Sequence, residues 1–231
     1  MKYLLQICLM MMLSSITLQA QDKVEDAPLK KKKFSYSSGI EASILQFARI
    51  SSTLKTVGLK TIPRYTYFFN TGVDLNYHAT NSLHPFTGLH IKNLGMIYQY
   101  DDSIKHKYRV YTLGAPLGIK WYTKNKKLMV KAGVDAALAF NFKWKHFLND
   151  KKVFKSNEFF SDKTNLLFTS VFAGFSYSGF AVSGNFYLNE FFSNKNWGSV
   201  NNAQLITVSF GFNLDENTLK MKKSPVAKSA Q

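Results

Sequence analysis

The chain has 231 residues, 45% of them hydrophobic, with one cysteine and a formal net charge of +16. The cysteine, Cys8, lies in an apolar N-terminal leader, so the mature chain is expected to have no disulfide, thiol nucleophile or cysteine metal site. A basic charge of this size is typical of nucleic-acid binding. The leader predicts export from the cytoplasm, which argues against nucleic acid as a partner.

Residues 1–20 have the pattern of a secretory signal peptide: a cation at Lys2, a short apolar stretch, and Ala20 before the expected cleavage site. A membrane-anchoring helix is the alternative, but the stretch is short for a bilayer span and is interrupted by polar residues. Residues 21–33 end in four lysines and are expected to form a periplasmic N-terminal tail.

Alternation of apolar with small or polar residues at a period of two predicts eight strands between residues 34 and 214. The expected strands cover 34–47, 64–77, 86–98, 108–122, 128–144, 165–177, 179–188 and 203–214. In the third strand the alternation slips near Asn93 and Leu94, which predicts a bulge. The fifth has the clearest pattern, with every second residue apolar from Leu128 to Trp144. A tilted strand of roughly 9–11 residues crosses a bilayer, and this strand is long enough.

Connection lengths predict how the strands are oriented. With the N-terminus in the periplasm, the outward connections are long and the inward ones short, as is typical of outer-membrane barrels. The long ones are 48–63, 99–107, 146–164 and 189–202, and the short ones are 78–85, 123–126 and 178. We therefore expect residues 34–214 to form an all-β, eight-stranded antiparallel transmembrane β-barrel, an up-and-down meander. It would lie in the outer membrane of a Gram-negative bacterium with both termini periplasmic, followed by a basic C-terminal tail at 215–231.

The alternation also fits a soluble, lipocalin-like carrier, in which the apolar face lines a cavity. Side-chain volume distinguishes the two, because an eight-stranded barrel has an interior just wide enough for side chains. Most of the strand glycines share the polar face: Gly39, Gly72, Gly88, Gly114, Gly118, Gly133 and Gly211. We expect these small residues inside and the aromatic and aliphatic ones outside, against lipid.

Six charged residues on the expected inward face balance one another: Glu41, Asp74 and Asp135 against Lys92, Lys120 and Lys131. Because an unpaired buried charge is costly, these residues are predicted to pair and to plug the lumen. A narrow ion path is the alternative that the sequence leaves open.

The net positive charge is then expected in loops and tails. The connection after the fifth strand is the richest in lysine, with Lys143, Lys145, Lys151, Lys152, Lys155 and Lys163. Such cations either serve solubility and anchoring at the membrane edge or contact the phosphates of lipopolysaccharide. Outer-membrane lipid and lipopolysaccharide are therefore the expected partners, with secretion or envelope proteins as further candidates.

No residue pattern predicts catalysis or a cofactor. The five histidines show no serine and carboxylate in phase with them and no metal-ligand spacing. The chain also has no G-x-S-x-G motif and no phosphate-binding glycine loop. We expect no enzyme, and no catalytic, cofactor-binding or metal-binding residues.

Residues 88–98 (GLHIKNLGMIY) and 109–120 (RVYTLGAPLGIK) resemble the third and fourth strands of small outer-membrane barrels common in Bacteroidetes. These are the PorT-like and outer membrane protein β-barrel domain groups. The resemblance implies an eight-stranded barrel without catalytic residues and, for PorT-like members, a link to type IX secretion. The predicted function is a structural or interaction role in the cell envelope. The alternatives are an accessory barrel of type IX secretion and a barrel that binds lipid or a small ligand.

Overall fold

The computed structural model describes residues 33–49, 59–100, 103–193 and 203–214. Within these ranges, only the backbone is described at 41–44, 59, 67–69 and 214. The expected signal peptide (1–20), nearly all of the expected N-terminal tail (21–33) and the C-terminal tail (215–231) lie outside the described residues.

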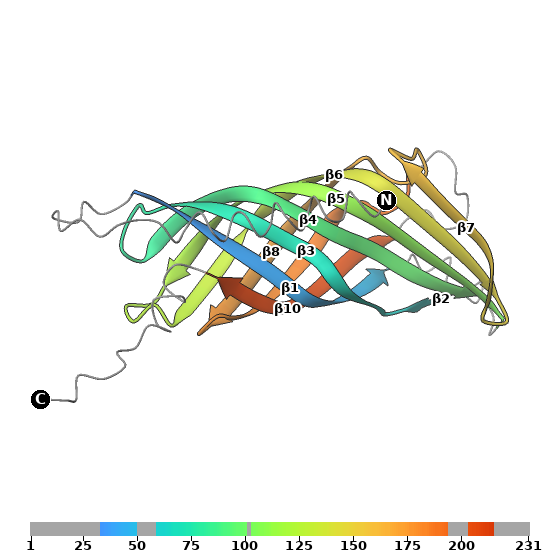
Figure 1. Cartoon of the computed structure of the whole chain (residues 1–231), viewed down its shortest axis with the longest axis horizontal. Helices are drawn as coiled ribbons and strands as arrows, with labels where there is room; N and C mark the ends of the chain where they lie inside the picture. The colour runs from blue at the N-terminus through green and yellow to red at the C-terminus, as the bar shows by residue number, and fades with distance from the viewer. Residues whose placement is uncertain (1–32, 50–58, 101–102, 194–202, 215–231) are drawn as a thin grey trace, which may run out of the picture. The chain divides into compact units, whose positions relative to one another are not determined.

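Eight strands close into a ring in chain order (Figure 1). They are β1 (Phe34–Arg49), β3 (Arg64–Tyr77), β4 (Leu83–Tyr100), β5 (Ile104–Tyr122), β6 (Leu128–Leu148), β8 (Leu167–Tyr177), β9 (Phe180–Glu190) and β10 (Gln204–Leu214). Each strand pairs antiparallel with its neighbours in the chain, and β10 pairs with β1 to close the ring. The predicted fold class, an all-β, eight-stranded antiparallel up-and-down barrel, is confirmed.

Two shorter strands extend this ring. The strand β2 (Leu59–Ile62) pairs with the last residues of β4, and Pro63 separates it from β3. The strand β7 (Lys151–Phe159) folds back along the last residues of β6. Residues 146–164 were expected as a loop, so β7 and the end of β6 correct that prediction. The connection expected at 99–107 is likewise mostly strand, because β4 runs to Tyr100 and β5 begins at Ile104.

The two ends of the barrel differ. At one, which we call the turn end, the connections are the short segments 78–82, 123–127 and Ser178–Gly179. Ser178 and Gly179 both have positive φ, 49° and 95°, which gives a two-residue type I′ hairpin. The barrel begins and finishes here, since Phe34 pairs with Tyr77 and the Asn213 N–H donates to the Gly179 carbonyl at 2.8 Å. We call the other end the hairpin end. Here the long strands β4, β5 and β6 continue, and β7 pairs with the last residues of β6.

Large apolar side chains cover the outer surface between two rows of aromatic residues. Tyr111 and Phe140, with ring centroids 6.2 Å apart, belong to the row nearer the hairpin end, and Trp121 to the row at the turn end. Ten residues of β5 separate Tyr111 from Trp121, or about 33 Å along the strand at about 3.3 Å per residue. A tilt of about 40° reduces this to about 25 Å, the height of the apolar band of a transmembrane barrel. We call the strands between these rows the spanning segment.

The outward side chains of the spanning segment include Leu113, Leu117, Val134, Val171 and Phe210, all more than a third exposed. A soluble carrier would bury this face, so the arrangement is that of a transmembrane barrel. Among the described residues, no helix is long and apolar enough to cross a membrane.

The bulge predicted at Asn93 and Leu94 is wrong. The even residues of β4 face inward from His84 to Tyr98, and the register with β5 shows no shift there. The inward side chains His90 and Lys92 are polar, whereas those from Leu94 onward are apolar or aromatic. In the sequence, this change from polar to apolar looks like a shift of the alternation by one residue.

A bulge does interrupt the next pair of strands. The register of β5 with β6 shifts between Tyr111 and Thr112, at residues 139–141 of β6. Beyond it the even residues of β6 turn inward, so Phe142 is 1% exposed and Trp144 packs against the interior. The outward apolar face of β6 therefore ends at Phe140, and the predicted nine-position face is two positions too long.

Polar side chains fill an interruption in the barrel wall between β3 and β4. Pairing of these strands covers residues 71–76 and 86–91, and β2 pairs with β4 only from Ile97 onward. Between these stretches the Asn93 N–H donates to Asn70 Oδ1 at 2.6 Å, and Gln46 Nε2 donates to the Asn93 carbonyl at 2.6 Å. The Arg64 guanidinium donates to Gln46 and to Asn93. These bonds replace backbone pairs that the ladder lacks here.

Candidate functional site: the lumen network and the cationic outer face

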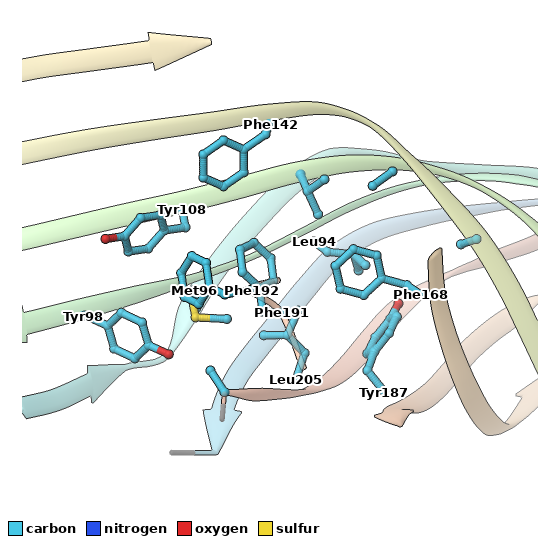
Figure 2. Close-up of a cluster of buried hydrophobic side chains, with 14 residues drawn as sticks. Leu94, Met96, Tyr98, Tyr108, Phe142, Phe168, Tyr187, Phe191, Phe192 and Leu205 are labelled. Atoms are coloured by element: carbon cyan, nitrogen blue, oxygen red, sulfur yellow. The ribbon is translucent and has the colours of Figure 1, made fainter. Parts of the chain in front are cut away.

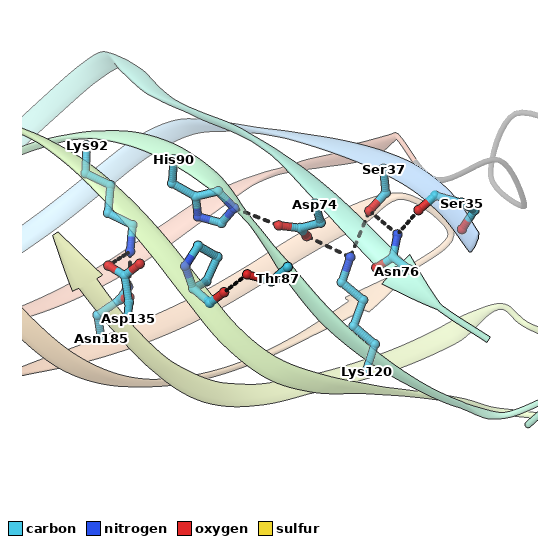
Figure 3. A network of polar contacts seen from close by, with 11 residues as sticks. Ser35, Ser37, Asp74, Asn76, Thr87, His90, Lys92, Lys120, Asp135 and Asn185 are labelled. Atoms are coloured by element: carbon cyan, nitrogen blue, oxygen red, sulfur yellow. Dashed lines mark hydrogen bonds and ion pairs between the residues drawn. The ribbon is translucent and has the colours of Figure 1, made fainter. Parts of the chain in front are cut away.

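A polar network crosses the interior near the turn end (Figure 3). Its centre is Asp74 on β3, whose Oδ2 lies 2.7 Å from Lys120 Nζ and whose Oδ1 lies 2.7 Å from His90 Nε2. Lys120 Nζ also donates to Ser37 Oγ at 2.8 Å, and Asn76 Nδ2 donates to the same oxygen at 3.0 Å. The network joins β1, β3, β4 and β5, so it ties together four neighbouring strands across the lumen.

A second ion pair lies nearer the hairpin end. Lys92 Nζ on β4 is 2.9 Å from Asp135 Oδ2 on β6 and 3.5 Å from Asn185 Oδ1 on β9. Lys92 and Asp135 are both buried. Since β4 and β6 are not neighbours in the ring, this pair reaches across the lumen rather than along its wall.

The structure brings together four of the six charged residues predicted for the lumen, as the pairs Asp74–Lys120 and Asp135–Lys92. Lys131 is half-buried and lines the same interior space. Glu41 lies in β1 opposite Asn70, and its side chain is outside the described residues. His90 is a member that the sequence prediction omitted. Its even position on β4, in phase with Lys92, is the signal that could have identified it.

Glycines make room for two phenylalanine rings beside this network. A Cβ on Gly118 would lie 2.9 Å from Phe86 and 3.1 Å from Phe172, and one on Gly133 would lie 2.8 Å from Phe172. The two rings are 6.1 Å apart, and Lys120 Nζ lies 4.7 Å from the centroid of Phe86. The space left around the network is about 50 Å³, enough for a few water molecules.

The hairpin half of the lumen is filled by apolar and aromatic side chains (Figure 2). We call this cluster the lumen plug. Its members are Leu94, Met96, Tyr98, Tyr108, Val110, Ala137, Ala139, Phe142, Phe168, Tyr187, Phe191, Phe192, Ala203 and Leu205. Phe191 and Phe192 follow β9 and contact one another edge to face at 5.0 Å. The expectation that bulky residues face only outward is therefore wrong for the lumen plug, and also for Phe86 and Phe172 beside the polar network.

A group of cations lies on the outward face just beyond the aromatic row at Tyr111. We call Lys107, Arg109, Lys143, Lys145 and Lys155 the cationic outer face. Strand pairing makes them neighbours, because Arg109 is opposite Lys143, Lys107 is opposite Lys145, and Lys145 is opposite Lys155. Arg109 Cζ and Lys143 Nζ lie 5.3 and 5.2 Å from the centroid of Tyr111, so the two cations share one ring.

The cations of this face repel one another. Desolvation and then the nearby Arg109, Lys155 and Lys145 lower the pKa of Lys143 from its ordinary value. Desolvation is also the largest cause of the lowered pKa of Lys145, followed by Arg109 and the surrounding lysines. In the part of the chain that the structure describes, no carboxylate forms an ion pair with any of the five cations.

The six lysines predicted as loop contacts have different surroundings. Lys143, Lys145 and Lys155 belong to the cationic outer face, whereas Lys151 and Lys152 lie exposed at the start of β7. Lys163 forms an ion pair with Glu158. Hydrogen bonds from Lys163, Ser161 and Ser156 hold the pKa of Glu158 at about 2. Lys107 and Arg109 were not in the predicted set, because they lie near a different connection and only strand pairing brings them beside Lys143 and Lys145.

The histidines at the two ends of the barrel form two pairs. His78 Nδ1 and His84 Nε2 are 3.2 Å apart at the turn end, and the rings of His106 and His146 stack at 4.4 Å at the hairpin end. Trp144 Nε1 donates to His106 Nδ1 at 3.1 Å, which fixes that ring. Among the described residues, no group of three or more His, Cys, Asp or Glu is arranged to hold a metal ion.

Neither a protein-family profile nor a curated protein matches the sequence. Among solved structures, the chain is similar to Neisserial surface protein A, with a TM-score of 0.41 and 13% identity over 80% of this chain and 97% of that one. It is also similar to Ail, the attachment invasion locus protein of Yersinia pestis, with a TM-score of 0.35 and 11% identity over 78% and 97%. A structure of Ail with the heparin analogue sucrose octasulfate gives 0.38 and 10%. The fold described above stands on the strand pairing of this chain.

Proposed function

We propose that this protein is a closed, non-catalytic outer-membrane barrel that acts as a structural or interaction component of the cell envelope. The observation that carries the proposal is the filled lumen. The lumen plug occupies one half, and the paired charges Asp74–Lys120 and Asp135–Lys92 occupy the other. A barrel in this state has no continuous water path, so its membrane-facing and end surfaces remain as the places where it can act.

The orientation is part of the proposal. The turn end would face the periplasm and the hairpin end the outside, since periplasmic turns are short and extracellular segments long in this class of barrel. Both chain tails would then be periplasmic, because the barrel begins and finishes at the turn end.

Conductance in a planar lipid bilayer tests the closed lumen. The purified full-length protein should give no steady single-channel current. A plug variant, Phe191→Ala/Phe192→Ala, removes two rings at the centre of the lumen plug and should raise the frequency of openings at least tenfold. Phe175→Ala is the matched control, because Phe175 is an aromatic residue on the outer surface. Steady currents from the unmodified protein would contradict the proposal.

A role beside secretion machinery is a second candidate. Its support is the resemblance of residues 88–98 and 109–120 to PorT-like barrels, and these segments form the neighbouring strands β4 and β5. Affinity purification from native outer membranes tests it, since co-purified secretion subunits would favour this role. The third possibility, a barrel with a small ligand inside, fits less well. The interior space of about 50 Å³ is far below the roughly 300–1,000 Å³ of ligand pockets.

A further inference from the structure

The cationic outer face is an unusual arrangement for a β-sheet surface. Like charges directly opposite one another on paired strands destabilise the sheet, yet Lys107, Lys145 and Lys155 occupy adjacent positions on three strands. Neighbouring strands are about 4.8 Å apart, so Lys145 lies opposite each of the other two lysines at a strand spacing shorter than the Debye length of about 8 Å at physiological salt. An external anion that neutralises several of them at once would remove this repulsion.

The height of this face along the barrel indicates which anion it meets. Arg109 lies two residues beyond Tyr111 on the same face of β5, so the first cations follow directly after the aromatic row. In transmembrane barrels the aromatic rows mark the headgroup level. Arg109 and Lys143 are therefore at the level of lipid phosphates, and Lys107, Lys145 and Lys155 lie one step farther out.

Apolar groups next to this face supply contacts for acyl chains. Phe159 and Phe160, at the end of β7, are 68% and 63% exposed, and Phe159 is opposite Asn141, at the level of Tyr111. Lys107 Nζ lies 4.8 Å from the centroid of Phe147, so a second aromatic ring makes a cation–π contact with a cation nearer the hairpin end. A ligand that fits this surface has several anionic groups on the side toward the hairpin end and hydrocarbon chains on the side toward the spanning segment.

We propose that the cationic outer face binds the phosphates of a lipid A-type glycolipid in the outer leaflet. Arg109 and Lys143 form the inner pair of contacts, and Lys107, Lys145 and Lys155 form the outer row. A headgroup with two phosphates uses both levels, whereas a phospholipid with a single phosphate reaches only one. This inference rests on the proposed orientation, which places the hairpin end outside.

Binding to the detergent-solubilised full-length protein tests the inference. The probes are lipid A with two phosphates, its dephosphorylated form, and phosphatidylglycerol, and the readout is the dissociation constant at fixed salt. The bisphosphorylated form should bind at least tenfold more tightly than either of the others. Equal binding of phosphatidylglycerol would overturn the assignment to a glycolipid, and equal binding of the dephosphorylated form would overturn the role of phosphate.

The variant Arg109→Gln/Lys143→Gln should weaken binding of bisphosphorylated lipid A by about 25-fold, since a cation at a membrane surface contributes about fivefold. Lys124→Gln/Lys127→Gln removes the same charge from an exposed turn at the opposite end and should leave affinity within twofold. Arg109→Lys keeps the charge and should retain most of the affinity, which separates charge from misfolding. Unchanged affinity in the glutamine variant refutes the inference. Channel conductance does not depend on this site, so the result of the binding experiment neither supports nor contradicts the proposed closed lumen.

Discussion

Lys120 shows how a charge is kept inside this barrel. Its ammonium group contacts the Asp74 carboxylate, the Ser37 hydroxyl and the face of Phe86, and its side chain is 1% exposed. Removing one partner of such a buried pair typically costs about 3–5 kcal/mol, because the other charge is left uncompensated. The ion pairs of Lys120 and Lys92 therefore join strands across the lumen, and removal of either partner is expected to be destabilising.

Glycine at position 133 is required by the close packing of the lumen. A Cβ there would lie 2.3 Å from the Leu117 carbonyl oxygen and 2.6 Å from the Gly118 Cα, and backbone atoms cannot move aside as a flexible side chain does. Gly133→Ala should therefore lower the free energy of unfolding by about 1–3 kcal/mol, the usual cost of overpacking. Urea unfolding in detergent or lipid vesicles measures this value.

Gly184→Ala is the matched control on the same barrel. The nearest atom to a Cβ at this position is the Thr207 carbonyl oxygen at 3.8 Å, an ordinary contact distance. The substitution should leave stability within about 0.5 kcal/mol. Equal effects of the two substitutions would contradict the packing described for the lumen.

At the scale of elements, β6 illustrates how one strand serves two environments. From Leu128 to Phe140 its even residues face lipid, and after the bulge at residues 139–141 its even residues face the lumen plug. The bulge allows Phe142 to pack inside while Lys143 and Lys145 turn outward. The strand thus passes from the spanning segment to the cationic outer face without leaving the sheet.

Lipid contact along β6 can be tested at its midpoint. Val134 is 51% exposed near the centre of the spanning segment. Val134→Arg should lower stability in lipid vesicles by about 2–4 kcal/mol, the cost of a lipid-facing cation at the midplane. Val153→Arg places the same group on β7 beyond the spanning segment, where the cost should be close to zero. A Val134→Arg barrel as stable as the unmodified one in lipid would exclude this surface from the bilayer core.

Alternation predicts a strand well where its apolar residues face outward and its polar residues face inward along the whole strand. The strand predicted at residues 64–77 has those bounds in the structure, because most of its described outward residues are apolar and its inward ones polar or glycine. Prediction failed on β4 and β6, where Leu94 and Phe142 place apolar groups inside. The prediction relies on polarity to indicate the side that a residue faces, and that relation is lost wherever the lumen is apolar.

The candidate sites were predictable to different degrees. Asp74, Lys92, Lys120 and Asp135 follow from the phase of a polar inward face. The cationic outer face depends on the register of three strands, and no single strand shows it. Lys107 and Lys155 are 48 positions apart in the chain and become near neighbours only through Lys145.

At the scale of the whole barrel, the two ends differ in chemistry. The turn end has short connections and basic turn residues, whereas the hairpin end combines the lumen plug with the cationic outer face. The two ends therefore differ in where their cations lie, because those of the turn end are in a short connection and those of the hairpin end form a face on paired strands. The orientation of the barrel in the membrane therefore decides which leaflet the cationic outer face contacts.

Cysteine labelling on intact cells measures that orientation. Cys8 is the only cysteine of the chain and lies in the expected signal peptide, so single substitutions report on one position each. Val153→Cys, on exposed β7, should react with a membrane-impermeant maleimide on intact cells. Lys124→Cys, in an exposed turn at the opposite end, should react only after the outer membrane is permeabilised. The reverse pattern would place the hairpin end in the periplasm. That result would overturn the proposed orientation and, with it, the assignment of the cationic outer face to a glycolipid of the outer leaflet.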